Sequence, residues 1–433
     1  MQLKTPMNIT AALAAASAAL LTGQTHAAAT SSSLVEGWQF NAAVLAYAET
    51  ERVKAGEAIL QGRGDFGDDR YLNLNLVVDT LTGASATGAV PQNTVQTFSR
   101  PSGEGNYSIK AGDTPLDNTF HDTRVQFDAS WEQPLAPDWK GSVGGHFSKE
   151  YDYLSLGING GVSRDFNNKN TTLSLGSSFS SDRINPEGGI PNPLGAVPFR
   201  DNSQSDSSWD DEHQASRKDS SDNKTTAELL LGVTQVLNKN WLTQFNYSYA
   251  KVDGYQTDPF KMLSLVDAGG ITTGLVYENR PDSRTKQSLY WQNKVAVAGT
   301  YLDVSYRYLW DDWGLKSNTV DTRWRLPLTG DWFIEPHLRF YQQGATDFYT
   351  PFLAQNAPLP QYASADYRIG EMDAYTVGAK IGTVLDGNHE ASVRVEFYQQ
   401  NPKNPGVELP GVLKNLDVFA DVKAIMVQVN YSF

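Results

Sequence analysis

The chain has 433 residues, with 35 Lys and Arg against 49 Asp and Glu, so its formal net charge is -14. A negative balance of this size argues against nucleic-acid binding. The chain contains no cysteine, which excludes disulfides, thiolate metal sites, haem attachment through CxxCH and cysteine nucleophiles.

The first residues are typical of a secretory signal peptide. Lys4 precedes an uncharged, Ala-rich run over 9–21, and Thr25, His26 and Ala27 resemble a small-residue cleavage site. The alternative, an uncleaved membrane anchor, is weakened because a spanning helix needs roughly 20 apolar residues. We therefore expect a signal peptide over 1–27, a short N-terminal segment over 28–35 and the main domain over 36–433.

The C-terminus gives the clearest fold signal. Val427, Val429, Tyr431 and Phe433 are apolar, and the residues between them are polar. Alternation with a period of two that ends on an aromatic residue is typical of a membrane β-strand. The same four residues resemble the C-terminal signal that barrel-insertion machinery recognises, so we expect them to act as an insertion signal.

The same alternation recurs through the chain at the length that a tilted membrane strand needs, about 9 to 11 residues plus extensions. It predicts an even number of strands, sixteen, with the first two the least sharply separated. Their expected ranges are 37–48, 51–63, 70–82, 121–133, 139–150, 152–165, 170–182, 224–236, 241–254, 285–297, 301–312, 317–328, 332–343, 371–385, 388–400 and 420–433.

The connections between these strands predict a sidedness. Long connections fall at 83–120, 183–223, 255–284, 344–370 and 401–419. Short ones fall at 66–69, 136–138, 167–169, 238–239, 298–300, 329–331 and 386–387. With a periplasmic N-terminus, every long connection lies outside and these short turns lie in the periplasm, as in outer-membrane barrels.

These observations predict an all-β fold, a transmembrane antiparallel up-and-down β-barrel of about 16 strands with long extracellular loops and short periplasmic turns. The expected location is the outer membrane of a Gram-negative bacterium, among its lipid and lipopolysaccharide. Trp139, Trp241 and Trp332 each follow a short turn, as expected of a periplasmic aromatic girdle.

The polar face of the strands carries charges of both signs, which a water-filled lumen favours. The lumen-lining candidates are Arg124, Asp128, Asp303, Arg307, Arg323, Arg325, Glu335, Arg339, Lys380, Arg394 and Glu396. They could bias which solutes pass, or form cross-strand ion pairs that stiffen the wall. The group around Arg323 and Arg325 could be a basic stripe for anionic solutes or mixed-sign packing with Asp321 and Glu335, and both interpretations stay open.

Enzymatic, metal and cofactor signals are weak, and we expect no catalytic, metal or cofactor site. His213, beside Asp210 and Asp211, is the only candidate for a hydrolase at the barrel rim. The loop that holds it, 183–223, lacks the D-x-D-x-D-G spacing of a calcium site, so we expect a solvated loop.

Several segments resemble an uncharacterised family of Gram-negative outer-membrane β-barrels, the domain of unknown function 3570. They are 79–85, 255–261, 277–284, 339–344 and 347–349. Directly after the first segment, the chain has Ala86 where the family form has Pro. The resemblance implies a barrel and no catalytic residue, with periplasmic redox or metal-handling partners. Within these segments, Gly83 and Pro259 have a structural explanation as turn formers. Arg280 and Arg284 could contact lipopolysaccharide phosphate or form loop ion pairs.

Three functions remain in order of preference. The first is a porin-like channel for small hydrophilic solutes. The alternative is a non-conducting scaffold or sheath for periplasmic or extracellular redox or metal-handling partners. The most distant is a rim hydrolase.

Overall fold

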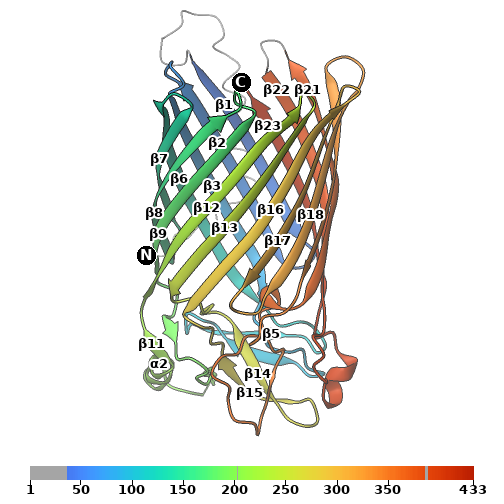
Figure 1. Ribbon diagram of the computed structural model, residues 1–433. Helices are drawn as coiled ribbons and strands as arrows, with labels where there is room; N and C mark the ends of the chain where they lie inside the picture. The colour runs from blue at the N-terminus through green and yellow to red at the C-terminus, as the bar shows by residue number, and fades with distance from the viewer. Residues whose placement is uncertain (1–36, 202, 386–388) are drawn as a thin grey trace, which may run out of the picture.

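The computed structural model describes residues 37–201, 203–385 and 389–433. The expected signal peptide and the segment 28–35 lie outside the described residues. The chain forms a closed antiparallel barrel in the order β1-β2-β3-β6-β7-β8-β9-β12-β13-β16-β17-β18-β19-β21-β22-β23 (Figure 1). Every barrel strand pairs with its neighbour along the chain, which is the predicted up-and-down topology.

All sixteen predicted strands are present, and most boundaries agree within two or three residues. They are β1 Trp38–Glu49, β2 Val53–Asp65, β3 Tyr71–Ala86, β6 Leu116–Ala136, β7 Trp139–Lys149, β8 Tyr153–Phe166, β9 Thr171–Ile184, β12 Asp222–Asn238, β13 Trp241–Gly254, β16 Ser283–Val297, β17 Thr300–Asp311, β18 Lys316–Pro327, β19 Trp332–Gln343, β21 Met372–Leu385, β22 His389–Pro402 and β23 Val422–Ser432. The largest difference is at β6, which begins at Leu116 rather than near residue 121.

The early start of β6 comes from an irregularity in its partner β3. The register between the two strands shifts between Gly83 and Ser85, and pairing then continues to Ala86 and Leu116. Gly83 has a φ of 130°, and a Cβ at this position would lie 2.5 Å from the carbonyl oxygen of Arg52. A glycine is therefore required for this bulge, beyond which the two strands continue to pair.

The barrel is closed between its first and last strands. β1 pairs with β23 from Asn41 and Ser432 to Glu49 and Ala424. Beyond this ladder, the backbone N–H of Phe40 donates to the carbonyl of Phe433 at 2.7 Å, and that of Phe433 donates to Phe40 at 2.9 Å. The terminal aromatic residue thus completes the closing seam.

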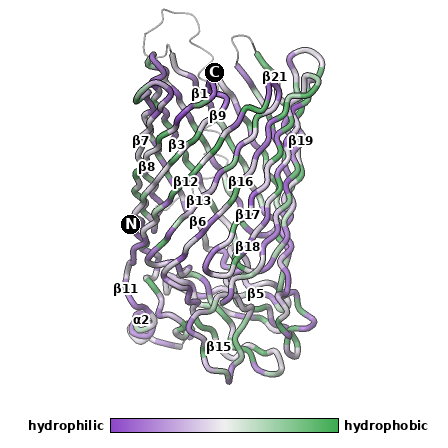
Figure 2. Tube along the Cα trace, viewed as in Figure 1, coloured by the Kyte–Doolittle hydropathy of each residue, from purple (hydrophilic) through white to green (hydrophobic). Residues whose placement is uncertain are grey.

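Alternating side chains along the strands face opposite sides of the barrel wall. Large apolar residues are exposed on the outside, including Val143 at 62%, Ile158 at 68% and Phe397 at 62%. Figure 2 shows hydrophobic and hydrophilic residues alternating along the strands. An exposed apolar surface of this extent is stable in lipid rather than in water, so the barrel spans a membrane.

The predicted tryptophan girdle residues lie near the end of the barrel where the chain turns are short, which we call the turn end. Trp139, Trp241 and Trp332 begin β7, β13 and β19 and are 36%, 42% and 50% exposed. The guanidinium of Arg164 lies 5.1 Å from the Trp139 ring centroid, on the same outward face. No described helix is long and apolar enough to cross a membrane.

All five long connections emerge at the opposite end, the loop end, and we call them together the loop cap: 87–115, 185–221, 255–282, 344–371 and 403–421. Figure 1 shows them gathered below the barrel. The described part of the cap contains β4 Gln96–Ser99, β5 Asn106–Ile109, β10 Ile190–Pro191, α2 Asp206–Ala215, β11 Arg217–Asp219, β14 Met262–Val266, β15 Thr272–Tyr277, β20 Leu353–Ala354, η1 Tyr367–Ile369 and η3 Gly411–Asn415.

The loop cap has its own core, which the polar composition of the loops did not predict. Leu263 and Ala363 are fully buried and pack with Val276. This contact joins the loop 255–282 to the loop 344–371, which is far from it in sequence. Leu413 of a third loop packs with Val266. The expected solvated loop 183–223 instead contains α2, where Trp209 is 1% exposed and donates a 2.7 Å hydrogen bond to the Gly103 carbonyl.

Candidate functional site: the charged lumen

The eleven predicted lumen residues lie on the inward face of their strands. They are Arg124 and Asp128 on β6, Asp303 and Arg307 on β17, Arg323 and Arg325 on β18, Glu335 and Arg339 on β19, Lys380 on β21, and Arg394 and Glu396 on β22. The register places Lys294, Asp303 and Arg323 in one cross-strand row. It places Glu335, Lys380 and Arg394 in another.

Water can reach some of the inward side chains. The side chain of Lys294 is 60% exposed and that of Arg323 is 46% exposed, although both point into the barrel. Even the apolar Leu230, which is inward on β12, is 44% exposed. The interior is therefore an aqueous lumen rather than a packed core, as expected for a barrel of sixteen strands.

A continuous network of ion pairs crosses β18, β19, β21 and β22, and we call it the charge ladder. Its members are Asp321, Arg323, Arg325, Glu335, His337, Lys380, Glu390, Arg394 and Glu396. At its centre, His337 lies 3.0 Å from the Asp321 carboxylate and 2.7 Å from the Glu396 carboxylate. Many of the charged side chains near Arg323 and Arg325 are therefore paired with a side chain of opposite charge, as the mixed-sign interpretation of the sequence predicts.

Arg124 and Asp128 are also partnered, on the opposite wall. Arg124 lies 2.7 Å from Asp79 on β3. Asp128 lies 2.6 Å from the ring of His146 and accepts a hydrogen bond from Asn75 at 3.0 Å. Arg307 and Arg339 differ, because neither forms an ion pair with any residue that the structure describes.

The two halves of the lumen wall carry opposite excess charge. On β16 to β22, the inward cations Arg284, Lys286, Lys294, Arg307, Arg323, Arg325, Arg339, Lys380 and Arg394 outnumber the carboxylates Asp303, Asp311, Asp321, Glu335, Glu390 and Glu396. On β1 to β12, the carboxylates Glu49, Glu57, Asp65, Asp79, Asp122, Asp128, Glu132, Asp165, Asp182, Asp222 and Glu228 outnumber the cations Arg63, Arg124, Lys140 and Lys224. A transverse electric field therefore crosses the lumen.

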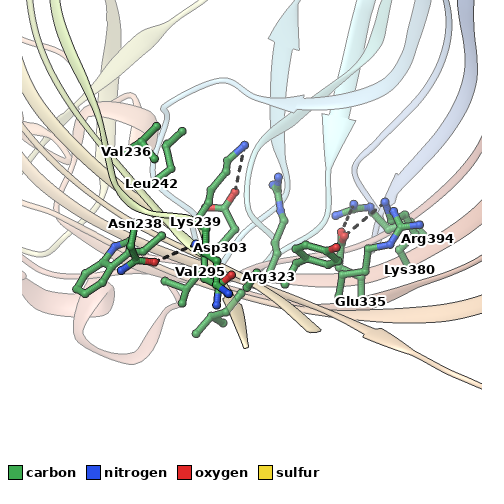
Figure 3. A pocket seen from close by; sticks show the side chains of 17 residues that line it. Val236, Asn238, Lys239, Leu242, Val295, Asp303, Arg323, Glu335, Lys380 and Arg394 are labelled. Atoms are coloured by element: carbon green, nitrogen blue, oxygen red, sulfur yellow. Dashed lines mark hydrogen bonds and ion pairs between the residues drawn. The ribbon is translucent and has the colours of Figure 1, made fainter. Parts of the chain in front are cut away.

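The turn end of the basic half contains a cavity of about 570 Å³. Lys294 and Asp303 line one side of it, and Arg323 reaches into it from β18. Figure 3 shows Glu335 beside Lys380 and Arg394 on the other side. The separations are 3.5 Å from Glu335 to Lys380 and 3.1 Å from Glu335 to Arg394.

The sequence motifs over 255–261 and 277–284 meet at a second charged cluster, inside the loop cap. This cap ion cluster consists of Asp258, Lys261, Glu278, Arg280, Asp366 and Arg368. Arg280 lies 2.6 Å from Glu278 and 2.7 Å from Asp366, and both carboxylates are fully buried. Arg280 is thus an ion-pair partner within the loops rather than an exposed phosphate contact, and Arg284 pairs with Asp311.

Burial and charge act in opposite directions on the two buried carboxylates. Burial raises the pKa of Glu278 to about 7, although Arg280 opposes the shift. Burial also acts to raise the pKa of Asp366, but Arg368, Lys261 and Arg280 together hold it below its usual value. Sequence reasoning identified the motifs but not their convergence, because the partners belong to different loops.

A carboxylate triad at the loop-end rim was not predicted either. Asp122, Glu150 and Asp152 offer oxygen atoms that lie within 4.8 Å of one another. Burial and the neighbouring Asp122 raise the pKa of Glu150 to about 7. Asp122 lies within β6, and Glu150 and Asp152 lie in the short turn between β7 and β8, which the up-and-down topology places beside it.

The expected rim hydrolase candidate, His213, lies on α2 against the loop 87–115. Its Nε2 atom is 3.2 Å from the carbonyl of Pro101 and 3.1 Å from the Arg217 guanidinium. Burial and the charge of Arg217 lower its pKa. These two contacts join α2 to the loop 87–115 and to β11.

The fold and the lumen define a transmembrane β-barrel with a water-accessible, charged interior. The chain belongs to the family described as protein of unknown function (DUF3570), whose sequence model matches residues 10–433. The family expected from the sequence motifs is thereby confirmed.

Solved structures resemble this fold only loosely. A mutant of the ferric enterobactin receptor of Pseudomonas aeruginosa (PfeA) has a TM-score of 0.42 and 10% identity, over 84% of this chain and 54% of the receptor. CdiB from Acinetobacter baumannii has a TM-score of 0.42 and 8% identity, over 92% of this chain and 60% of CdiB. A bacterial polysaccharide outer membrane secretin has a TM-score of 0.42 and 8% identity, over 92% and 98% of the two chains.

The chain thus spans about half the length of that receptor. Similarity at this level assigns no function to it. The comparison with curated proteins found no match.

Proposed function

We propose that the protein is a porin-like channel for small hydrophilic solutes in the outer membrane of a Gram-negative bacterium, with the loop cap outside and the turn end in the periplasm. The observation that carries this proposal is the exposure of inward charged side chains, above all Lys294 and Arg323, to water inside the barrel. A barrel that served only as a membrane anchor would not need a charged, wet interior.

The transverse field supports the same function. Carboxylates predominate on β1 to β12 and cations on β16 to β22, so a polar solute in the lumen meets opposite charges on opposite walls. Such an arrangement favours hydrated, dipolar solutes over apolar ones, because it orients their dipoles without burying them.

Planar-bilayer recordings of the purified full-length barrel test this proposal. We expect stable, ohmic single-channel conductance in potassium chloride. In liposome-swelling assays, small hydrophilic solutes should enter faster than larger ones. A barrel that inserts, shows heat-modifiable migration on gels and never conducts would contradict the channel.

The packed loop cap favours one alternative, a scaffold for extracellular or periplasmic redox or metal-handling partners. Its buried residues Leu263, Ala363 and Leu413 give the cap a fixed surface, which a docking platform needs. For this alternative we expect a non-conducting barrel and co-purification of a specific partner that is lost when the cap is destabilised.

A further inference from the structure

The cavity at the turn end of the basic half has more positive charge than its own carboxylates can balance. Its charged lining comprises the six basic residues Lys239, Lys294, Arg323, Arg325, Lys380 and Arg394, and the two acidic residues Asp303 and Glu335. We propose that this cavity binds the oxyanionic group, carboxylate or phosphate, of a solute in the lumen. The inference rests on the proposed function, because the solute must enter the lumen.

Both acidic residues of the cavity are already engaged. Glu335 lies 3.1 Å from Arg394 and 3.5 Å from Lys380, so it is shared between two cations. Both oxygens of Asp303 accept hydrogen bonds from Gln292 at 2.8 Å, and Lys294 is 3.8 Å away. Neither carboxylate is available to satisfy Arg323.

The nearest carboxylate to Arg323 lies outside the cavity and is engaged too. Asp321 is 3.6 Å from the Nε atom of Arg323, while its other oxygen is 3.0 Å from His337. Neither Arg323 nor Lys294 donates a side-chain hydrogen bond to any residue that the structure describes. Their N–H groups, on half-exposed side chains, remain available to a ligand.

Contacts with neighbouring side chains fix two of the cations that line the cavity, Arg325 and Lys380. The guanidinium of Arg325 lies 3.5 Å from the centroid of the Phe333 ring and 2.9 Å from Glu390. Lys380 lies 5.3 Å from the same ring. The cavity therefore combines the fixed cations Arg325 and Lys380 with available donors on the Arg323 guanidinium and the Lys294 ammonium group. This combination suits a planar carboxylate or a phosphate.

The volume and the surroundings agree with a solute rather than a bare ion. A cavity of about 570 Å³ is in the range of small-molecule sites, and its lining includes the exposed, inward-facing side chains of Arg323 and Lys294. The acidic half of the wall repels anions and favours their approach to the basic half.

Isothermal titration of the detergent-solubilised full barrel with inorganic phosphate tests the proposal without requiring conduction. We expect saturable binding that weakens about tenfold for each cation removed in Arg323→Gln and Lys294→Gln, and about a hundredfold in the double variant. Two arginines outside the cavity serve as controls: Arg63→Gln in the acidic half and Arg164→Gln on the outer face should both leave binding unchanged.

Equal phosphate binding by the native barrel and the double variant would overturn the proposal, as would equal losses in the two controls. Titrations with succinate and with phosphate at the same ionic strength separate carboxylate from phosphate ligands. A barrel that binds phosphate but never conducts would overturn the channel alone. A conducting barrel without saturable binding of either anion would overturn only the cavity.

Discussion

Arg280 illustrates what one charged residue does in the loop cap. Its guanidinium is 10% exposed and lies against Glu278 and Asp366, whose side chains have no exposed surface. Two buried carboxylates next to each other repel, and each would be costly to leave without a counter-charge. Arg280 therefore links the loop that follows β13 to the loop that follows β19.

We predict that Arg280→Ala destabilises the loop cap by about 3–5 kcal/mol, because it leaves buried carboxylates without their partner. Hydrogen exchange of the backbone amides of β14 and β15 should become faster, while the barrel strands keep their protection. Arg70→Ala is a suitable control, because the pair of Arg70 with Asp68 is exposed, with side-chain exposures of 45% and 87%. Its expected effect is under about 1 kcal/mol, and equal effects would contradict the prediction.

The carboxylate triad predicts a pH dependence at the loop-end rim. The folded pKa of Glu150 is about 7, above its ordinary value of 4.5, because of burial and then of Asp122. Its contribution to stability is therefore fully present below about pH 4.5 and is lost as the pH rises through about 7. Amides at 150–152 should exchange more slowly at pH 5 than at pH 8, after correction for the intrinsic exchange rates.

Replacing one member of the triad tests the cause of this shift. We expect Asp122→Asn to lower the pKa of Glu150, because it removes the neighbouring negative charge and leaves burial unchanged. Carbon-detected NMR titration of the Glu150 carboxyl measures this directly. An unchanged titration in Asp122→Asn would mean that burial and the charge of Asp152 account for the shift without Asp122.

The strands are the elements that the sequence specifies most directly. Period-two alternation depends only on neighbours in the chain, so segments such as 301–312 and the C-terminal strand could be located from local pattern alone. The early start of β6 could not, because it depends on a bulge at Gly83 in another strand. The charged residues of the lumen could be assigned to the inward face from the sequence. Their ion pairs could not, because these depend on the register between neighbouring strands.

The loop cap lies beyond local pattern for the same reason. Leu263, Ala363 and Leu413 come from three different loops and are separated by about fifty residues or more in the chain. Polar, Gly-rich and Pro-rich composition correctly identified connections between strands. It gave no signal that the connections would share a buried core, since only a few apolar residues in each loop contribute.

The closing seam gives a prediction at the level of elements. Deleting Phe433 removes its two backbone hydrogen bonds with Phe40 and the ring contact at 5.4 Å. Two hydrogen bonds are worth about 2 kcal/mol together, so the folded barrel should unfold at a lower temperature in gel-shift assays. Phe433→Tyr keeps the backbone bonds and should behave like the native chain, and equal melting of the deletion and native barrels would contradict the role of the seam.

At the scale of the whole molecule, the barrel wall separates two solvents. Leu230 and Leu231 are neighbours on β12 and have nearly equal exposures, 44% and 46%. Leu231 lies on the outward face with Phe245 and Trp291, in an apolar depression of the surface. Leu230 pairs in register with Ser248, on the inward face. Equal exposure therefore has opposite meanings, because one side chain contacts lipid and the other contacts water.

This pair of residues provides a matched test of the transmembrane barrel. Leu231→Arg places a charge in lipid and should destabilise the folded, membrane-inserted barrel by about 2–4 kcal/mol, as measured by reversible urea unfolding in liposomes. Leu230→Arg places the same charge in the aqueous lumen, near Glu228, so its effect should be close to zero. Similar losses in both variants would mean that the two faces meet the same solvent. A larger loss for Leu230→Arg would reverse the assignment of inside and outside.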